Sequence, residues 1–221
     1  MRIVAVRILT LLWLGLFIGL SSLLPAQAFT LLPPTESLAG LTPGVSTMAD
    51  AVRLHGAFDI TVPGIVEQYA GGNPATDQHR WSLGPSLGKP GLLVETSRRS
   101  KLIEVVMIDT YPGLSTKSGL TSLVSDGRAI ELYGLPDYAF EFSGDDCWFR
   151  EMYYIDQGLL LMLNQVPGRP NWTITKVILT YPTYLRNAVS LRERYALSGC
   201  GVVDDITSTY RVWARMATQP D

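Results

Sequence analysis

The chain has 221 residues, of which 18 are Lys or Arg and 20 are Asp or Glu, so its formal net charge is -2. This length suggests one or two domains, and the near-neutral, slightly acidic balance argues against a nucleic-acid-binding surface. With two Cys and two His in the sequence, a cysteine-ligated metal is improbable. We expect neither a metal nor another cofactor.

The first residues have the pattern of a secretory signal peptide. Arg2 and Arg7 precede a mostly apolar run over residues 8–24, and Pro25-Ala26-Gln27-Ala28 resembles a cleavage site. We therefore expect residues 1–28 to be removed and the remaining chain to be exported, to the periplasm or outside the cell. The alternative is an uncleaved membrane anchor, because the apolar run approaches spanning length.

The two cysteines, Cys147 and Cys200, allow a single disulfide pairing. Disulfides persist outside the cytosol, so export favours this bridge slightly. It would tie the second half of the chain to the C-terminal segment. Two buried free thiols are the alternative.

A leader and a first α/β unit are expected next. Residues 29–39 are predicted to be an unstructured leader, since Pro, Ser, Thr and Gly are frequent from residue 30 to residue 44. The first unit covers residues 40–112 and starts with a short helix, which Thr47 can cap and Gly56 can end with a positive φ. Its strand candidates are residues 65–69, a short strand around residues 78–81, and residues 92–96 and 102–108.

A second α/β unit is expected over residues 113–182. An extra helical turn is predicted between residues 113 and 124, followed by a second short helix, which Ser125 can cap and Gly134 can end with a positive φ. The strand candidates are residues 138–142, 147–154, 159–163 and 172–179, and their short loops require antiparallel neighbours. Residues 183–221 form a helical or mixed extension, with a helix over residues 184–197 and a strand or helix over residues 206–216.

The two predicted units share three landmarks in the same order. Residues 47–56 match residues 125–134 in hydroxyl, Ala, β-branched, Leu, ring and Gly positions. A Gly-Leu-Leu run follows at residues 91–93 and 158–160, and Thr-Tyr-Pro ends the units at residues 110–112 and 180–182. This self-similarity predicts an internal duplication. The expected fold class is α+β, with two tandem units that each have short helices packed on an antiparallel sheet.

Some of these motifs resemble a known family. Gly40-Leu41-Thr42, followed by a short helix that ends in Leu54-His55-Gly56, resembles the G-x-T, V, L-G-x-P opening of the BamE-like (SmpA/OmlA) domain, and Leu132-Tyr133-Gly134-Leu135-Pro136 contains the full L-x-G-x-P. The resemblance covers residues 40–182, with Phe58 in place of the first Pro. It implies exported α+β units with helices on one face of an antiparallel sheet. Two units in tandem are similar in architecture to the β-lactamase inhibitor protein, which implies a concave binding face.

Catalytic signatures are scarce. The sequence contains no G-x-S-x-G or H-E-x-x-H motif, and the Gly-rich stretch at residues 113–119 lacks the glycine before lysine of a Walker loop. We therefore expect a protein that is not an enzyme and that binds another protein or a peptide in the envelope or outside the cell. Envelope assembly or maintenance and enzyme inhibition are both compatible with such binding.

Aromatic residues are dense on two neighbouring strand candidates of the second unit. Residues two apart in a strand share a face, so helices on one face can bury only one of two adjacent aromatics. The others are expected on the open face, where Tyr and Trp act as interface anchors. The predicted binding residues are Trp81, Trp148, Tyr153, Tyr138 and Phe140.

Two alternatives stay open. The C-terminal segment could cover this sheet face, which would make all the aromatic residues core. The chain could also be a small-ligand or lipid carrier with a pocket between sheet and helices.

Overall fold

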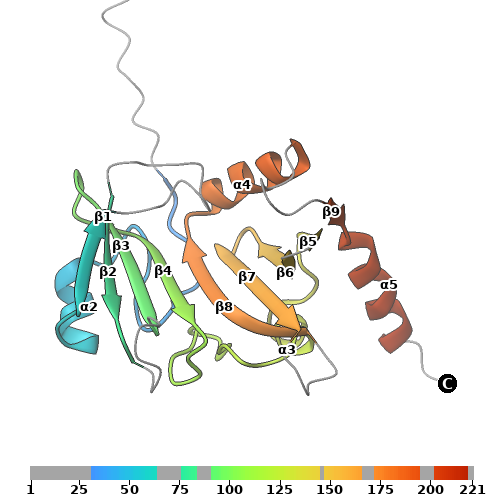
Figure 1. The fold of residues 1–221 in the computed structure, drawn as a ribbon, viewed down its shortest axis with the longest axis horizontal. Helices are drawn as coiled ribbons and strands as arrows, with labels where there is room; N and C mark the ends of the chain where they lie inside the picture. The colour runs from blue at the N-terminus through green and yellow to red at the C-terminus, as the bar shows by residue number, and fades with distance from the viewer. Residues whose placement is uncertain are drawn as a thin grey trace, which may run out of the picture. The chain divides into compact units, whose positions relative to one another are not determined.

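The computed structural model of the chain describes residues 31–63, 76–83, 91–144, 147–165, 172–194 and 202–218. Within these ranges it has a nine-stranded sheet, in the order β1-β2-β3-β4-β8-β7-β6-β5-β9, and a few short helices (Figure 1). Every strand pair is antiparallel. The expected α+β class with an antiparallel sheet is therefore confirmed.

The same order of elements, a short helix and then four strands, occurs twice along the chain. The first set is α2 (Met48–His55), β1 (Ile60–Pro63), β2 (Thr76–Trp81), β3 (Leu92–Ser97) and β4 (Ile103–Asp109). The second set is α3 (Asp126–Tyr133), β5 (Tyr138–Gly144), β6 (Cys147–Tyr154), β7 (Leu159–Gln165) and β8 (Trp172–Thr180). Because β4 pairs with β8, the last strands of the two sets join them into one sheet.

Three elements follow β8. Helix α4 (Pro182–Arg194) is succeeded by β9 (Val202–Asp205), which pairs with β5 at the sheet edge, and by α5 (Thr207–Thr218). The helix expected over residues 184–197 corresponds to α4, and the ambiguous residues 206–216 are helical. None of the helices in the described ranges is long and apolar enough to cross a membrane.

The helix ends follow the local sequence in part. Thr47 and Asp50 form a capping box at the start of α2, with the Asp50 N–H donating to Thr47 Oγ1 and the Thr47 N–H to Asp50 Oδ2. Gly56 and Gly134 end their helices with φ of 81° and 78°, as predicted. Ser125 was expected to cap α3 like Thr47, and this prediction is wrong, since its side chain makes no capping hydrogen bond.

The helical turn predicted between residues 113 and 124 is also wrong. These residues form a small hairpin in which Ser115 bridges Thr121. The Thr116 N–H donates to the Leu120 carbonyl at 2.8 Å, and the Leu120 N–H donates to Thr116 Oγ1 at 3.0 Å. Gly119, at φ 89°, reverses the chain, a conformation that interrupts a right-handed helix.

The leader packs against the body although it contains no helix or regular strand in residues 31–44. Leu38 and Leu41 are fully buried, and each donates its N–H to the carbonyl of the other at 2.9 Å. The Ala39 N–H donates to the Ser115 carbonyl at 2.9 Å. Burial of the two leucines and these backbone hydrogen bonds hold an irregular, Pro-rich segment against the sheet and helices.

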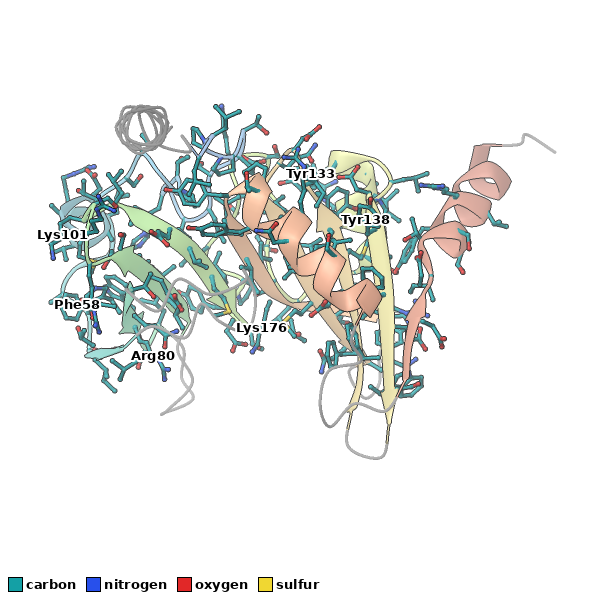
Figure 2. All side chains as sticks on the ribbon, turned by 90° about the horizontal axis from the view of Figure 1, so that it is seen from above. Phe58, Arg80, Lys101, Tyr133, Tyr138 and Lys176 are labelled. Atoms are coloured by element: carbon teal, nitrogen blue, oxygen red, sulfur yellow. The ribbon has the colours of Figure 1, made fainter. Side chains whose placement is uncertain are left out.

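The sheet has two faces, and each has its own core. The α2/α3 face carries a cluster that includes Ala51 and Ala129 of the two helices and Leu92, Leu159 and Tyr154 of the strands. The opposite face, called the α4 face, carries a cluster that includes Leu185, Ala188 and Val189 of α4. Figure 2 shows α4 lying across the strands of the second set.

Candidate binding surface around Trp148

Three of the five predicted binding residues are buried. Phe140 and Tyr153 lie in the core of the α4 face, and Trp81 lies in the core of the α2/α3 face. Their exposed fractions are 2%, 0% and 2%, which excludes them from a surface contact in this structure. Tyr138 and Trp148 remain exposed, at 37% and 54%.

Helix α4 is the reason for the burial on the α4 face. The sheet side chains under it are apolar and aromatic, and the inward side chains of α4 complete the cluster: Val105, Phe140, Phe142, Tyr153, Ile155, Leu160, Ile178, Leu185, Ala188 and Val189. The open face expected for the second set is therefore covered by the C-terminal segment. Tyr153 also uses its hydroxyl internally, donating to Glu151 Oε2 at 2.6 Å.

Trp81 is held by the end of α2. Its indole Nε1–H donates to the Gly56 carbonyl at 3.0 Å, and the His55 ring meets it edge-on at 6.4 Å. The second set repeats this contact, since the Tyr154 hydroxyl donates to the Gly134 carbonyl at 3.2 Å. Both aromatic residues therefore fasten a helix end to the sheet.

The two exposed aromatics lie on opposite faces. Trp148 shares its face with Met152 and Tyr154, which belong to the α2/α3 core, because residues two apart in a strand point the same way. Tyr138 lies beside Phe140 on the α4 face, with parallel rings whose centroids are 6.5 Å apart, and Figure 2 labels it at the start of β5. The structure therefore does not combine the two in one surface.

Trp148 is fixed although it is half exposed. Its ring meets Trp172 edge-on, with centroids 5.6 Å apart and planes at 89°. Its indole Nε1–H donates to Glu141 Oε1 at 3.3 Å. Because two contacts restrict its rotamer, a partner would have little side-chain entropy to remove on binding.

A charged pair supports this ring. Arg150 donates from Nε to Glu141 Oε2 at 2.6 Å, and its Cζ lies 4.2 Å from the centroid of the Trp172 ring. Both charged side chains are mostly buried, with exposures of 14% for Arg150 and 23% for Glu141. Trp148, Trp172, Arg150 and Glu141 are called the Trp148 cluster below.

The start of α5 lies next to this cluster. Tyr210 is buried and donates its hydroxyl to Asp126 Oδ2 at 3.1 Å, which joins α5 to the first residue of α3. Burial raises the pKa of Tyr210, the Asp126 carboxylate adds to this effect, and Arg150 opposes it. Helices α3 and α5 therefore border the cluster on the α2/α3 face.

Sequence reasoning missed the polar members of the cluster. Glu141 lies opposite Arg150 in the β5–β6 register. If the two strands are assumed to form a hairpin centred on residues 145–146, this register and the cross-strand charge pair follow from the sequence. It also missed two equivalent aspartates: Asp59 accepts the Ser82 N–H at 2.6 Å, and Asp137 accepts the Ile155 N–H at 2.7 Å. Each aspartate follows a helix-ending glycine at the same spacing, and this shared spacing could have predicted that the two are equivalent.

The remaining predictions concern cysteine and metal. Cys147 begins β6, but its side chain and all of Cys200 lie outside the described residues, so the disulfide stays a prediction. Among the described residues, no group of three or more His, Cys, Asp or Glu side chains could hold a metal ion.

Comparisons with protein-family models, with curated proteins and with solved structures gave no match.

Proposed function

We propose that the chain is an exported, non-enzymatic protein-binding module made of two tandem α/β units, with the Trp148 cluster as its binding surface. The observation that carries this proposal is a half-exposed tryptophan whose position is fixed by a second tryptophan and a mostly buried ion pair. Trp and Arg dominate the residues that supply most of the binding energy at protein interfaces. Export rests on the signal-peptide pattern of residues 1–28.

Equivalent contacts support the two tandem units. In both sets of elements an aromatic side chain donates to the carbonyl of the helix-ending glycine, and an aspartate accepts the N–H of the residue after that aromatic. In both sets the glycine N–H also closes the helix at 2.9 Å, on Val52 and on Ile130. Chance similarity would not be expected to repeat three such contacts in the same order.

Strand register gives independent support. Leu92 lies opposite Ile108, and Leu159 lies opposite Leu179, so Ile108 and Leu179 hold equivalent positions. Register shifts follow at Glu95/Thr96 and at Met162/Leu163, the same distance along β3 and β7. A register shift at a matching position is expected of a duplicated unit, since bulges are conserved within families.

The junction fits a two-fold arrangement of the proposed units. Met107 and Ile178 each precede one of the equivalent residues by one position, and they lie opposite each other in the β4–β8 pair. A two-fold axis would pass through this pair. When the two sets are aligned so that Ile108 corresponds to Leu179, and not to Ile178, their Thr-Tyr-Pro landmarks are offset by one residue. The first set has the additional residue before its Thr-Tyr-Pro, and Thr110 accommodates it with a positive φ of 50°.

The proposed family is the BamE-like one, and the tandem arrangement resembles that of the β-lactamase inhibitor protein. A short helix on one face of a four-stranded antiparallel sheet is what the resemblance implies for each unit. The hairpin at residues 113–124 adds Gly119-Leu120-Thr121, which parallels Gly40-Leu41-Thr42, and both leucines are fully buried. A binding role is part of this resemblance, whereas the sheet face of the second set opposite α3 is covered by α4.

The alternative of a small-ligand or lipid carrier is less well supported. It needs space between the helices and the sheet, where the described side chains, such as Ala51, Leu92, Ala129 and Leu159, are fully buried in one cluster. The exposed Trp148 has no evident role in such a carrier.

The test is site-specific photo-cross-linking in cells, followed by binding of the purified partner. A photoreactive amino acid replaces Trp148 in one variant and Leu54 in a control, since Leu54 is also exposed and lies on α2. We expect the first variant to cross-link a defined envelope or secreted protein that the second does not. Trp148→Ala should then weaken binding of that purified protein by about 2 kcal/mol or more.

Unchanged affinity of the Trp148→Ala protein, or no cross-linked protein at position 148, would contradict the proposal. Leu54→Ala serves as the binding control. The thermal midpoint of each variant shows that lost binding is not lost folding.

A further inference from the structure

The Trp148 cluster already binds one guanidinium group internally. Arg150 lies over the Trp172 ring at 4.2 Å and pairs with Glu141 at 2.6 Å. An aromatic face and a carboxylate together form a good environment for arginine, because the guanidinium is planar, weakly hydrated and stacks on tryptophan.

The ring of the neighbouring Trp148 also lies near a carboxylate, but none of the described cations stacks on it. Trp148 exposes 54% of its surface, while it meets Trp172 in a T-shaped contact and donates from its indole nitrogen to Glu141. In the part of the chain that the structure describes, the cation–π contact is that of Arg150 with Trp172. The exposed half of the Trp148 side chain is therefore accessible to a cation from outside.

The carboxylate for such a cation is Asp204. It lies directly opposite Glu141 in the β5–β9 register, and two carboxylates opposite each other are unfavourable unless a cation neutralises them. Arg150 pairs with Glu141, while the exposed Asp204 has no ion pair among the described residues. Trp148 and Asp204 share a sheet face, two strands apart and offset by two residues along the strands, so their Cα atoms are about 12 Å apart, a span that an arginine side chain between them can bridge.

We infer that this surface binds an arginine side chain presented by the partner protein. The guanidinium stacks on Trp148 and pairs with Asp204, as Arg150 stacks on Trp172 and pairs with Glu141. This inference rests on the proposed protein-binding function and specifies the chemistry of the partner: a segment with an exposed arginine, favoured over lysine because of its planar group.

The test uses N-acetyl-arginine amide as the probe and N-acetyl-citrulline amide as its neutral isostere. Binding is followed through the indole N–H signals in ¹⁵N-correlated NMR spectra, with the Trp148 signal assigned from its loss in Trp148→Phe. We expect the arginine probe to shift the Trp148 signal saturably in the millimolar range and the citrulline probe to leave it unchanged. Added salt should weaken the binding, since an exposed charge pair is screened.

Two variants make the test specific. Asp204→Asn should weaken arginine binding several-fold, while Asp156→Asn, which removes an exposed acid paired with Arg186, should leave it unchanged. Equal shifts with both probes, no shift with arginine, or equal affinity for wild type and Asp204→Asn would overturn the inference. The cross-linking test does not depend on these probes, so the absence of a partner at position 148 would overturn the proposed function separately.

Discussion

Trp81 and Tyr154 make the same hydrogen bond in the two halves of the chain. The Trp81 indole donates to the carbonyl of Gly56 at 3.0 Å, and the Tyr154 hydroxyl donates to the carbonyl of Gly134 at 3.2 Å. The rings also pack on the last residue of each helix, His55 at 6.4 Å and Tyr133 at 5.5 Å. A carbonyl that a helix leaves unpaired at its end thus finds a donor on the sheet.

Tyr154→Phe should therefore lower the free energy of unfolding by about 1 kcal/mol, because it removes this donor and keeps the ring. Tyr138→Phe is the matched control, because Tyr138 is exposed and its hydroxyl makes no hydrogen bond among the described residues. Urea denaturation measures both. Equal losses in the two variants would contradict a specific role of the Tyr154 hydroxyl.

The two helix starts predict unequal effects of the same substitution. Thr47→Ala removes the side-chain oxygen of the capping box of α2, and should destabilise the protein by about 1 kcal/mol. Ser125→Ala at the start of α3 removes no capping hydrogen bond and should change stability much less. Thermal unfolding of the two variants distinguishes them, and a larger loss for Ser125→Ala would refute the assignment.

Much of the sheet could be predicted from the sequence, since β5 to β8 begin at the residues where β-branched or aromatic runs were expected and are bounded by turn residues. β9 could not, because Val202–Asp205 is short and half acidic and becomes a strand only through the edge of β5. For the site, the strand period places Trp148 and Tyr153 on opposite faces, so the prediction that both lie on one open binding face was wrong. Which face stays open depends on where α4 packs, and residue spacing does not contain that information.

Gly158 is predicted to tolerate alanine far less than Gly134. Both have positive φ, 72° and 78°, so alanine costs about 1–3 kcal/mol of backbone strain at either position. At Gly158 a Cβ would also collide with the Thr180 carbonyl and lie 2.5 Å from Pro34 Cβ, whereas nothing lies within 4 Å at Gly134. We expect Gly158→Ala to be clearly the less stable protein in a denaturant titration; similar stabilities would contradict the close packing of the β6–β7 turn against Thr180 and Pro34.

His79 makes stability depend on pH. Its ring lies nearly buried between Thr61 Oγ1 at 3.0 Å and Thr96 Oγ1 at 3.2 Å. Burial lowers its pKa below the ordinary 6.5, against an opposing effect of Asp77. The unfolded chain therefore takes up this proton at a higher pH than the folded protein, so the contribution of His79 to stability is complete above pH 6.5 and is lost as the pH falls below it.

His79→Gln should flatten this pH dependence, since glutamine can hydrogen-bond but does not titrate. The measurement is the thermal midpoint of both proteins from neutral to mildly acidic pH. Parallel curves for the two proteins would show that other groups cause the dependence.

Helix α4 is predicted to be a permanent part of the fold and not a detachable cover. Leu185 is fully buried between α4 and the sheet, in the cluster with Tyr153 and Ile178. Leu185→Ala should lower the free energy of unfolding by about 2–5 kcal/mol, as for other buried leucines, and Ser190→Ala, on the exposed side of the helix, should lower it little.

If α4 instead opened readily, its contacts would contribute little to global unfolding. Leu185→Ala would then leave the denaturation midpoint unchanged while increasing amide hydrogen exchange in β6 and β7. A large loss in stability, together with amides of β6 and β7 that exchange in the wild-type protein only through global unfolding, would support the burial of Tyr153 and Phe140 as a fixed property. It would leave the Trp148 side of the sheet as the face available to a partner.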